Sequence, residues 1–119
     1  MSETTTPEFA RLSDYAYHWA EHHPEREALV LNQVRTSYGE LARRVRALSK
    51  ALLRAGVRKG DRVAMLVSSR PEFYVALLAT VDIGAIWLGL HPRYMLPEFR
   101  HVLAEAQPKA LLAFGASNP

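Results

Sequence analysis

The second half of the sequence alternates between helical and strand patterns, and this order constrains the fold more than any other feature. From Ser37 onward the order is helix, strand, helix, strand, helix, strand. Strands are expected at 63–67, 85–88 and 109–114, and the first is an apolar run without a polar break, typical of a strand buried on both faces. Alternation of this kind requires right-handed crossovers between parallel strands. The sequence therefore predicts an α/β fold, in which helices flank a parallel sheet.

The helix that begins after Ser37 has the clearest local signals. Ser37 and Glu40 have the spacing of a capping box, in which the Ser37 hydroxyl accepts from the Glu40 amide and the Glu40 carboxylate accepts from the Ser37 amide. Gly56 suits the left-handed residue that closes such a helix. The apolar residues between these ends step by four, three and four, and are Leu41, Val45, Leu48 and Leu52. Two further helices are expected, one from Ser69 and Pro71 to Gly84 and one over 97–106.

Ahead of the alternating region, the sequence predicts a helix and a hairpin. Thr6 and Pro7 suit an N-cap and a first-turn proline, so a helix is expected over 8–21. Strand patterns at 27–31 and 34–38 flank Asn32-Gln33. A two-residue turn at that pair forces a side chain into positive φ.

The composition indicates one small globular domain. The chain has 119 residues, of which 49% are hydrophobic and 23% charged. It has no cysteine, which excludes disulfides, thiolate metal ligands and cysteine nucleophiles within these residues. The first seven residues are polar rather than basic and apolar, and no apolar run reaches the roughly 20 residues of a membrane span. We therefore expect a cytoplasmic location without a membrane span.

The formal net charge is +3, and most of the excess positive charge lies between Arg43 and Arg62. On a helix, four basic residues of this stretch recur at three- and four-residue steps, and they are Arg43, Arg46, Lys50 and Arg54. This spacing predicts one solvated face. The alternative, binding of nucleic acid through 43–62, normally adds interleaved aromatics or a motif, and neither is present. No nucleic-acid partner is expected.

Four sequence blocks resemble the start of AMP-forming acyl-CoA synthetases, within the adenylate-forming enzyme superfamily. They are Thr-Ser-Tyr-Gly-Glu-Leu at 36–41, Lys-Gly-Asp-Arg-Val-Ala at 59–64, Ser-Arg-Pro-Glu-Phe at 69–73 and Trp-Leu-Gly-Leu-His-Pro-Arg-Tyr at 87–94. Their order and spacing make the match specific over about two thirds of the chain. The segment 86–90 is most similar to fatty or aryl acyl-CoA ligases.

The resemblance implies that residues 1–119 are a partial AMP-binding domain, an incomplete part of the large N-terminal region. Intact members activate a carboxylic acid with ATP and Mg²⁺ and pass the acyl group to CoA. These residues contain no Gly/Ser/Thr-rich phosphate loop with a lysine, no Tyr-Gly-x-Thr-Glu segment, and no match to the family's ribose-binding aspartate or catalytic lysine. We therefore expect no catalytic residue, no cofactor for the isolated chain and no activity alone. The expected partner is the downstream remainder of the enzyme, with self-association through an open sheet edge as a further possibility.

The candidate site residues lie in or directly after the last of the four blocks. Arg93 is expected at the carboxyl end of a strand, where open α/β sheets bind ligands. In some acyl-CoA ligases the matching arginine approaches a phosphate of CoA, and the alternative is an ordinary surface arginine. His91 stands where many relatives have asparagine, and Met95 stands where they have a capping Thr or Ser, a loss of about 1 kcal/mol if nothing replaces the cap.

Two other features have competing interpretations. Residues 69–72 lie between a strand and a helix, where backbone donors could receive an anion, but an ordinary helix cap is the favoured interpretation. His18 and His22 share a helical face without an evident third ligand, so no metal site is expected. For the chain as a whole, the alternative to a ligase fragment is a self-standing α/β binding or interaction module without catalysis.

Overall fold

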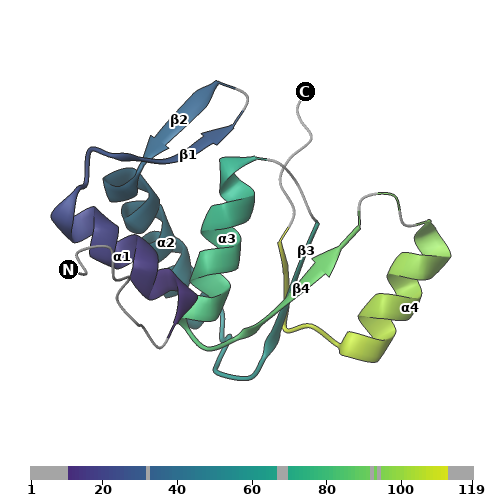
Figure 1. The fold of residues 1–119 in the computed structure, drawn as a ribbon. Coiled ribbons are helices and arrows are strands. Elements are labelled where there is room, and N and C mark those ends of the chain that lie inside the picture. The colour runs from purple at the N-terminus through teal and green to yellow at the C-terminus, as the bar shows by residue number, and fades with distance from the viewer. Residues whose placement is uncertain (1–10, 32, 67–69, 92, 94, 113–119) are drawn as a thin grey trace, which may run out of the picture.

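The computed structural model describes residues 11–31, 33–66, 70–91, 93 and 95–112 (Figure 1). The elements follow in the order α1 (Leu12–His22), β1 (Glu27–Leu31), β2 (Val34–Ser37), α2 (Tyr38–Arg54), β3 (Arg62–Leu66), α3 (Pro71–Asp82), β4 (Ile86–Leu90), α4 (Leu96–Ala106) and β5 (Ala110–Leu112).

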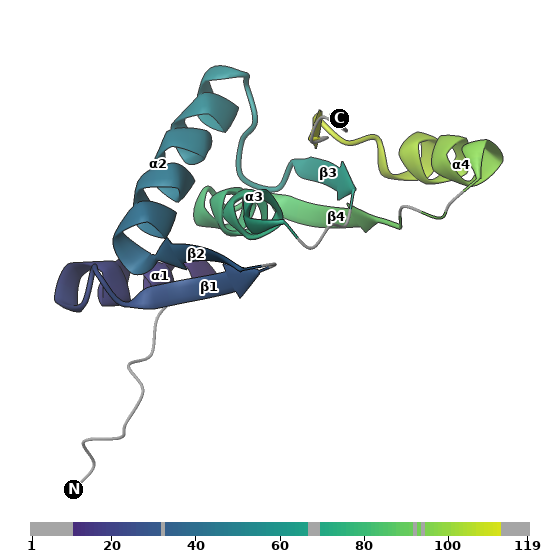
Figure 2. The ribbon, with the colours of Figure 1, turned by 90° about the horizontal axis from the view of Figure 1, so that it is seen from above.

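The three later strands form a parallel sheet in the order β4-β3-β5. Ala64 of β3 lies opposite both Leu88 of β4 and Leu111 of β5. The chain crosses from β3 to β4 through α3 and then returns in the opposite direction, past β3 to β5, through α4. Because both crossovers are right-handed, these opposite directions place α3 and α4 on opposite faces of the sheet. Figures 1 and 2 show this arrangement, with α1, α2 and α3 on one side of the sheet and α4 on the other. The predicted α/β fold with its parallel sheet is confirmed.

The core lies where α2, α3 and the sheet meet. Val45 of α2, Val63 of β3 and Ala79 of α3 are fully buried within one apolar cluster. The predicted face of α2 forms part of it, with Leu48 only partly buried. Burial across three elements of one cluster stabilises each of them more than its own helix or strand propensity does.

The ends of α2 follow the predicted signals in part. The Ser37 hydroxyl accepts from the Glu40 amide at 3.2 Å. The Glu40 carboxylate, however, accepts from Arg43 and Arg44 rather than completing the capping box. At the other end Gly56 has φ +97°, and its amide and that of Val57 donate to Leu53 and Leu52, which is the Schellman arrangement.

The first helix begins later than predicted. Arg11 is extended, with φ −123° and ψ 149°, and its amide donates to the Asp14 carboxylate at 3.1 Å. The prediction of one helix over 8–21 is therefore wrong at its start, because Asp14 offers Arg11 an N-cap arrangement. Thr6 and Pro7 lie outside the described residues.

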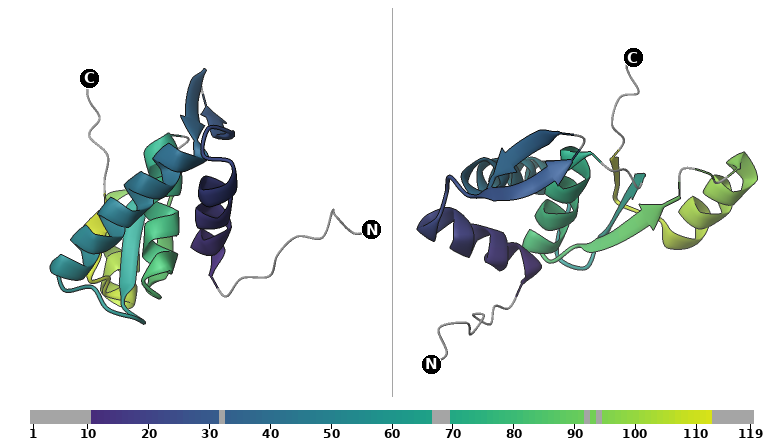
Figure 3. Two further views of the ribbon diagram at one scale, coloured as in Figure 1. Left: turned by 90° about the vertical axis from the view of Figure 1, so that its left-hand side faces the viewer. Right: turned by 45° about the horizontal axis from the view of Figure 1, so that its top comes forward.

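The hairpin of β1 and β2 is antiparallel, as predicted, and is seen from two more sides in Figure 3. Gln33 has φ +69°, the positive value that the turn was expected to force on a side chain. Asn32 lies outside the described residues, as do Val67 and 113–114 at the predicted strand ends.

The caps of the later helices differ from the sequence-based expectation. The N-cap of α3 is Arg70, and Pro71 takes the first helical position. Ser69 lies outside the described residues. At α4, Met95 is the N-cap, and its amide donates to the Glu98 carboxylate at 2.7 Å. Glu98 therefore supplies a cap that offsets the absent Thr or Ser.

Within the described ranges, no helix combines the length and apolar character that a membrane crossing requires.

Candidate functional site

The carboxyl ends of the parallel strands define one edge of the sheet. β3 ends at Leu66, β4 at Leu90 and β5 at Leu112. The exposed residues Arg70, His91 and Arg93 follow the first two of these ends. Because the strands are parallel, these residues belong to the same edge, as predicted for Arg93.

A local hydrogen bond orders the turn after β4. The Arg93 amide donates to Nδ1 of His91 at 3.0 Å. His91 thus supplies a hydrogen-bond acceptor within this turn, and the exposed Arg93 side chain lies at the sheet edge.

The strand before this turn is shaped by a close contact between Trp87 and Gly89. A Cβ at Gly89 would lie 2.5 Å from Cη2 of Trp87, a distance that side chains do not tolerate. The Trp87 ring in turn meets Phe73 of α3 edge-on, with centroids 5.7 Å apart. Gly89 therefore lets the indole lie along the strand and reach the first turn of α3, which positions β4 relative to that helix.

At the opposite edge of the sheet, a polar cluster surrounds Asp82 that was not predicted from the sequence. Its carboxylate accepts from the hydroxyls of Ser13 at 2.8 Å, Tyr17 at 3.0 Å and Ser49 at 2.9 Å. Arg11 donates to the Asp82 carbonyl at 2.7 Å. The cluster joins α1, α2 and the last residue of α3. A carboxylate at a helix C-terminus is disfavoured by the helix dipole, and that was the one available signal that Asp82 has a structural role.

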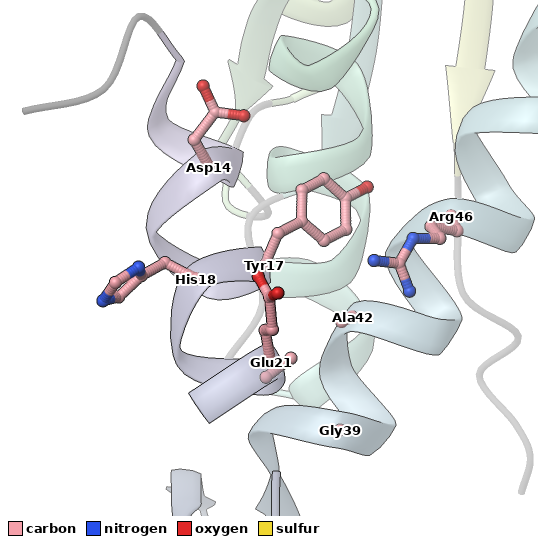
Figure 4. A pocket seen from close by; sticks show the side chains of 8 residues that line it. Asp14, Tyr17, His18, Glu21, Gly39, Ala42 and Arg46 are labelled. Carbon is pink, nitrogen blue, oxygen red and sulfur yellow. The ribbon is translucent and has the colours of Figure 1, made fainter. Parts of the chain in front are cut away.

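The same cluster changes the chemistry of Tyr17. Burial, reinforced by the hydrogen bond and the charge of Asp82, raises the pKa of Tyr17 to about 12. Tyr17 therefore holds its proton throughout the physiological range and acts as a hydrogen-bond donor. Across a pocket of about 570 Å³, the Arg46 guanidinium lies 4.6 Å from the centroid of the Tyr17 ring (Figure 4).

The basic face of α2 is exposed, as predicted, but one of its arginines makes a contact that the prediction did not include. Arg43, Arg46, Lys50 and Arg54 are all exposed. Arg46 nevertheless makes a cation–π contact with α1, because its reach lets the guanidinium lie on an aromatic face while remaining hydrated.

Two histidines of α1 lie close together. The rings of His18 and His22 have centroids 4.5 Å apart. In the part of the chain that the structure describes, no three His, Cys, Asp or Glu side chains are placed to hold a metal ion.

The fold and the four sequence blocks together define an opening portion of an adenylate-forming α/β region. The model of the AMP-binding enzyme family matches residues 16–118. The chain therefore belongs to the AMP-binding enzyme family.

CoA ligases are among the known proteins that resemble the chain. The chain is 41% identical to a feruloyl-CoA synthase of an Amycolatopsis species over 76 residues, which are 64% of this chain and 16% of that protein. It is 29% identical over 101 residues to a medium/long-chain-fatty-acid and 3-oxocholest-4-en-26-oate CoA ligase of Mycobacterium marinum, covering 85% of this chain and 18% of that protein. The N-terminal subdomain of Klebsiella oxytoca NpsA superimposes with a TM-score of 0.79 and 27% identity, over 92% of this chain and 29% of that chain. The chain thus spans less than a fifth of the length of these two curated relatives.

Proposed function

We propose that these residues are the N-terminal part of an ATP-dependent acyl-CoA ligase, which converts a carboxylic acid, ATP and CoA into acyl-CoA, AMP and pyrophosphate. The observation that carries the proposal is the family match over 16–118, with acyl-CoA ligases among the relatives. The acid is proposed to be an aryl or fatty acid, because a feruloyl-CoA synthase and a fatty-acid CoA ligase are among the similar proteins.

In this proposal, the residues act as scaffold and are inactive alone. They lack the phosphate loop and the lysine that adenylation uses, so they cannot neutralise the charge that develops on leaving pyrophosphate. ATP, Mg²⁺ and CoA would be bound by the complete enzyme. A cytoplasmic location remains a prediction from the sequence.

An uncovered apolar face supports a downstream partner. Ile86 of β4 is 48% exposed and Leu111 of β5 is 53% exposed, and both point to the sheet face opposite α3. On the same side, α4 contains no buried residue among those described, and Leu96 is 61% exposed. Apolar side chains this exposed lose the stabilisation that burial would give them. We therefore propose that later parts of the same polypeptide cover this face.

Arg93 is the proposed contact of the complete enzyme with a CoA phosphate. Its place at the carboxyl edge suits a ligand entrance, and a guanidinium matches phosphate oxygens with paired donors. Within the described residues, no hydrogen bond or ion pair occupies the Arg93 guanidinium, so it is available to a ligand.

A chimera provides the test. Residues 16–112 would replace the matching segment of the Amycolatopsis feruloyl-CoA synthase, and CoA-dependent thioester formation would be measured. We expect an active chimera, because a scaffold of the same family should support the recipient's own catalytic motifs. A chimera that folds but forms no adenylate would contradict the ligase proposal and favour a self-standing binding module.

The role of Arg93 is tested in the same chimera. Arg93→Ala should raise the KM for CoA roughly tenfold, as expected for the loss of a charge-assisted phosphate contact, while the KM for ATP stays unchanged. Arg100→Ala, which removes an exposed arginine from α4, is the matched control. Equal effects of the two substitutions would remove Arg93 from the CoA site.

A further inference from the structure

A second cavity, of about 670 Å³, lies at the amino edge of the sheet, away from Arg93. Lys59 precedes β3 and Gly84 precedes β4, and both line it. The remaining wall comes from the start of α1, the middle of α2 and the end of α3. Figure 1 shows the start of α1 beside the end of α3.

The charges around this cavity are unbalanced. Four of its lining side chains are cationic and one is a carboxylate, and these are Arg11, Arg46, Lys50, Lys59 and Asp82. The carboxylate already accepts from three hydroxyls and lies 3.8 Å from the Arg11 guanidinium. The charges of Asp82 and Arg11 therefore largely offset one another. Among the residues that the structure describes, no other carboxylate lines the cavity to balance the remaining three cations.

The three remaining cations, Arg46, Lys50 and Lys59, differ in the contacts that they make. Arg46 lies over the ring of Tyr17, and a cation–π contact leaves its N–H donors available at the edge of the guanidinium. Lys59 crosses Gly84 so closely that a Cβ there would lie 3.0 Å from Cγ of Lys59. Gly84 has φ +77°, so the backbone favours glycine at this position as well. In the described ranges, neither the Lys50 nor the Lys59 ammonium has an acceptor.

The end of α3 explains only part of this positive charge. Cations are favoured near a helix C-terminus, and Arg11 fills that role by donating to the Asp82 carbonyl. Lys50 and Arg46 belong to α2 and make no hydrogen bond to the last carbonyls of α3 in the described structure. A ligand that carries several negative charges would balance them.

We propose that this cavity binds a small phosphate-bearing anion with at least two negative charges. Ammonium and guanidinium groups that approach from different elements suit a compact, multiply charged anion better than a single carboxylate. Leu53 and Ile83 give the cavity an apolar portion, which is compatible with the carbon part of a phosphate ester. The site is independent of the proposed ligase activity, because it lies at the other edge of the sheet from Arg93.

The test uses the ¹⁵N-labelled chain of 119 residues, at a concentration below the onset of self-association in light scattering. The chain is titrated with pyrophosphate and, separately, with glycerol 3-phosphate while amide shifts are recorded. We expect saturable shifts at Gly84 and Ser49 and none at Arg93. Preference for pyrophosphate would identify an inorganic ligand, and preference for glycerol 3-phosphate would identify a phosphate ester. Absence of saturable shifts with both probes would overturn the proposal.

Variants that remove one positive charge inside or outside the cavity distinguish a specific binding site from nonspecific electrostatic attraction to a basic surface. Lys59→Gln and Lys50→Gln should each weaken binding roughly tenfold, as a lost charge-assisted hydrogen bond implies. Arg54→Gln removes the same charge from α2 outside the cavity and should change affinity less than about twofold, because an exposed distant charge is screened by salt. Lys59→Arg should keep most of the affinity. Equal weakening by Lys50→Gln and Arg54→Gln would refute the site even if the Lys59 variant fails to fold.

Discussion

Replacing Tyr17 with phenylalanine is the sharpest test of the cluster that joins the three N-terminal helices. The substitution removes one hydroxyl, which donates to Asp82 at 3.0 Å, and retains the ring that Arg46 covers. A hydrogen bond to a charged acceptor contributes roughly 1.5–3 kcal/mol. Because Ser13 and Ser49 still donate to the carboxylate, we expect Tyr17→Phe to lower the free energy of unfolding at pH 7 by about 1.5–2 kcal/mol.

The pH dependence gives this prediction a second, independent readout. Burial first, and then Asp82, raise the pKa of Tyr17 from 10.0 to about 12 in the folded state. The folded state therefore holds the phenolic proton more tightly than the unfolded state. The resulting stabilisation is fully present below pH 10 and is lost as the pH rises through 12. Two pKa units correspond to about 2.7 kcal/mol at most, and solvent screening of this partly buried side chain reduces the expected contribution to about 1 kcal/mol.

Urea denaturation followed by circular dichroism, at pH values from 7 to 12, measures both effects. The difference in unfolding free energy between the original chain and Tyr17→Phe should narrow by about 1 kcal/mol as the pH rises above 10. Tyr74→Phe is the matched control, because its hydroxyl makes no hydrogen bond in the described structure. A loss below about 0.5 kcal/mol at pH 7, or a difference that does not depend on pH, would refute the assigned role of Tyr17.

Three further predictions concern the strand contact, the chemistry and the uncovered face. Gly89→Ala should displace the Trp87 indole, because no Cβ fits beside it, and should shift tryptophan emission and lower stability by roughly 1–3 kcal/mol; an unchanged spectrum and stability would contradict the contact. The isolated chain should release no pyrophosphate from ATP with a panel of fatty and aromatic acids, and release above a protein-free control would overturn the assignment as scaffold. The isolated chain should also self-associate with rising concentration through its open sheet edges and the face that exposes Ile86 and Leu111, as measured by light scattering; a monomer that is independent of concentration would favour the self-standing module.

The sequence was informative where the determining interactions are local. The ends of α2 could be predicted from Ser37 and Gly56, because a cap and a left-handed closing residue act within a few positions of the helix. The place of Arg93 followed from topology, since the carboxyl ends of parallel strands must share an edge. Its proposed ligand stays a prediction.

The Asp82 cluster and the basic cavity beside it could not be predicted in the same way. Asp82 lies 69 positions from Ser13 and 33 from Ser49 in the sequence. Serine, tyrosine and aspartate at such separations form no periodic pattern, so only the packing of α1 and α2 against α3 brings them together. The start of α1 was predicted too early for a related reason. Both Thr6 and Asp14 are able to cap a helix, and a single sequence does not show which of the two caps is more stable.

The position of β3 at the centre of the sheet has a consequence for how the chain is assembled during synthesis. β3 pairs with β4, for example Arg62 with Ile86, and with β5, for example Val63 with Ala110, and the second pair is separated by about twice as many residues as the first. Doubling the closed loop costs roughly 0.6 kcal/mol more in chain entropy. As the polypeptide leaves the ribosome, the unit of β3, α3 and β4 can therefore close before β5 has emerged. β5 then adds last to a preformed edge, and strands translated later would meet a sheet whose twist and register are already set.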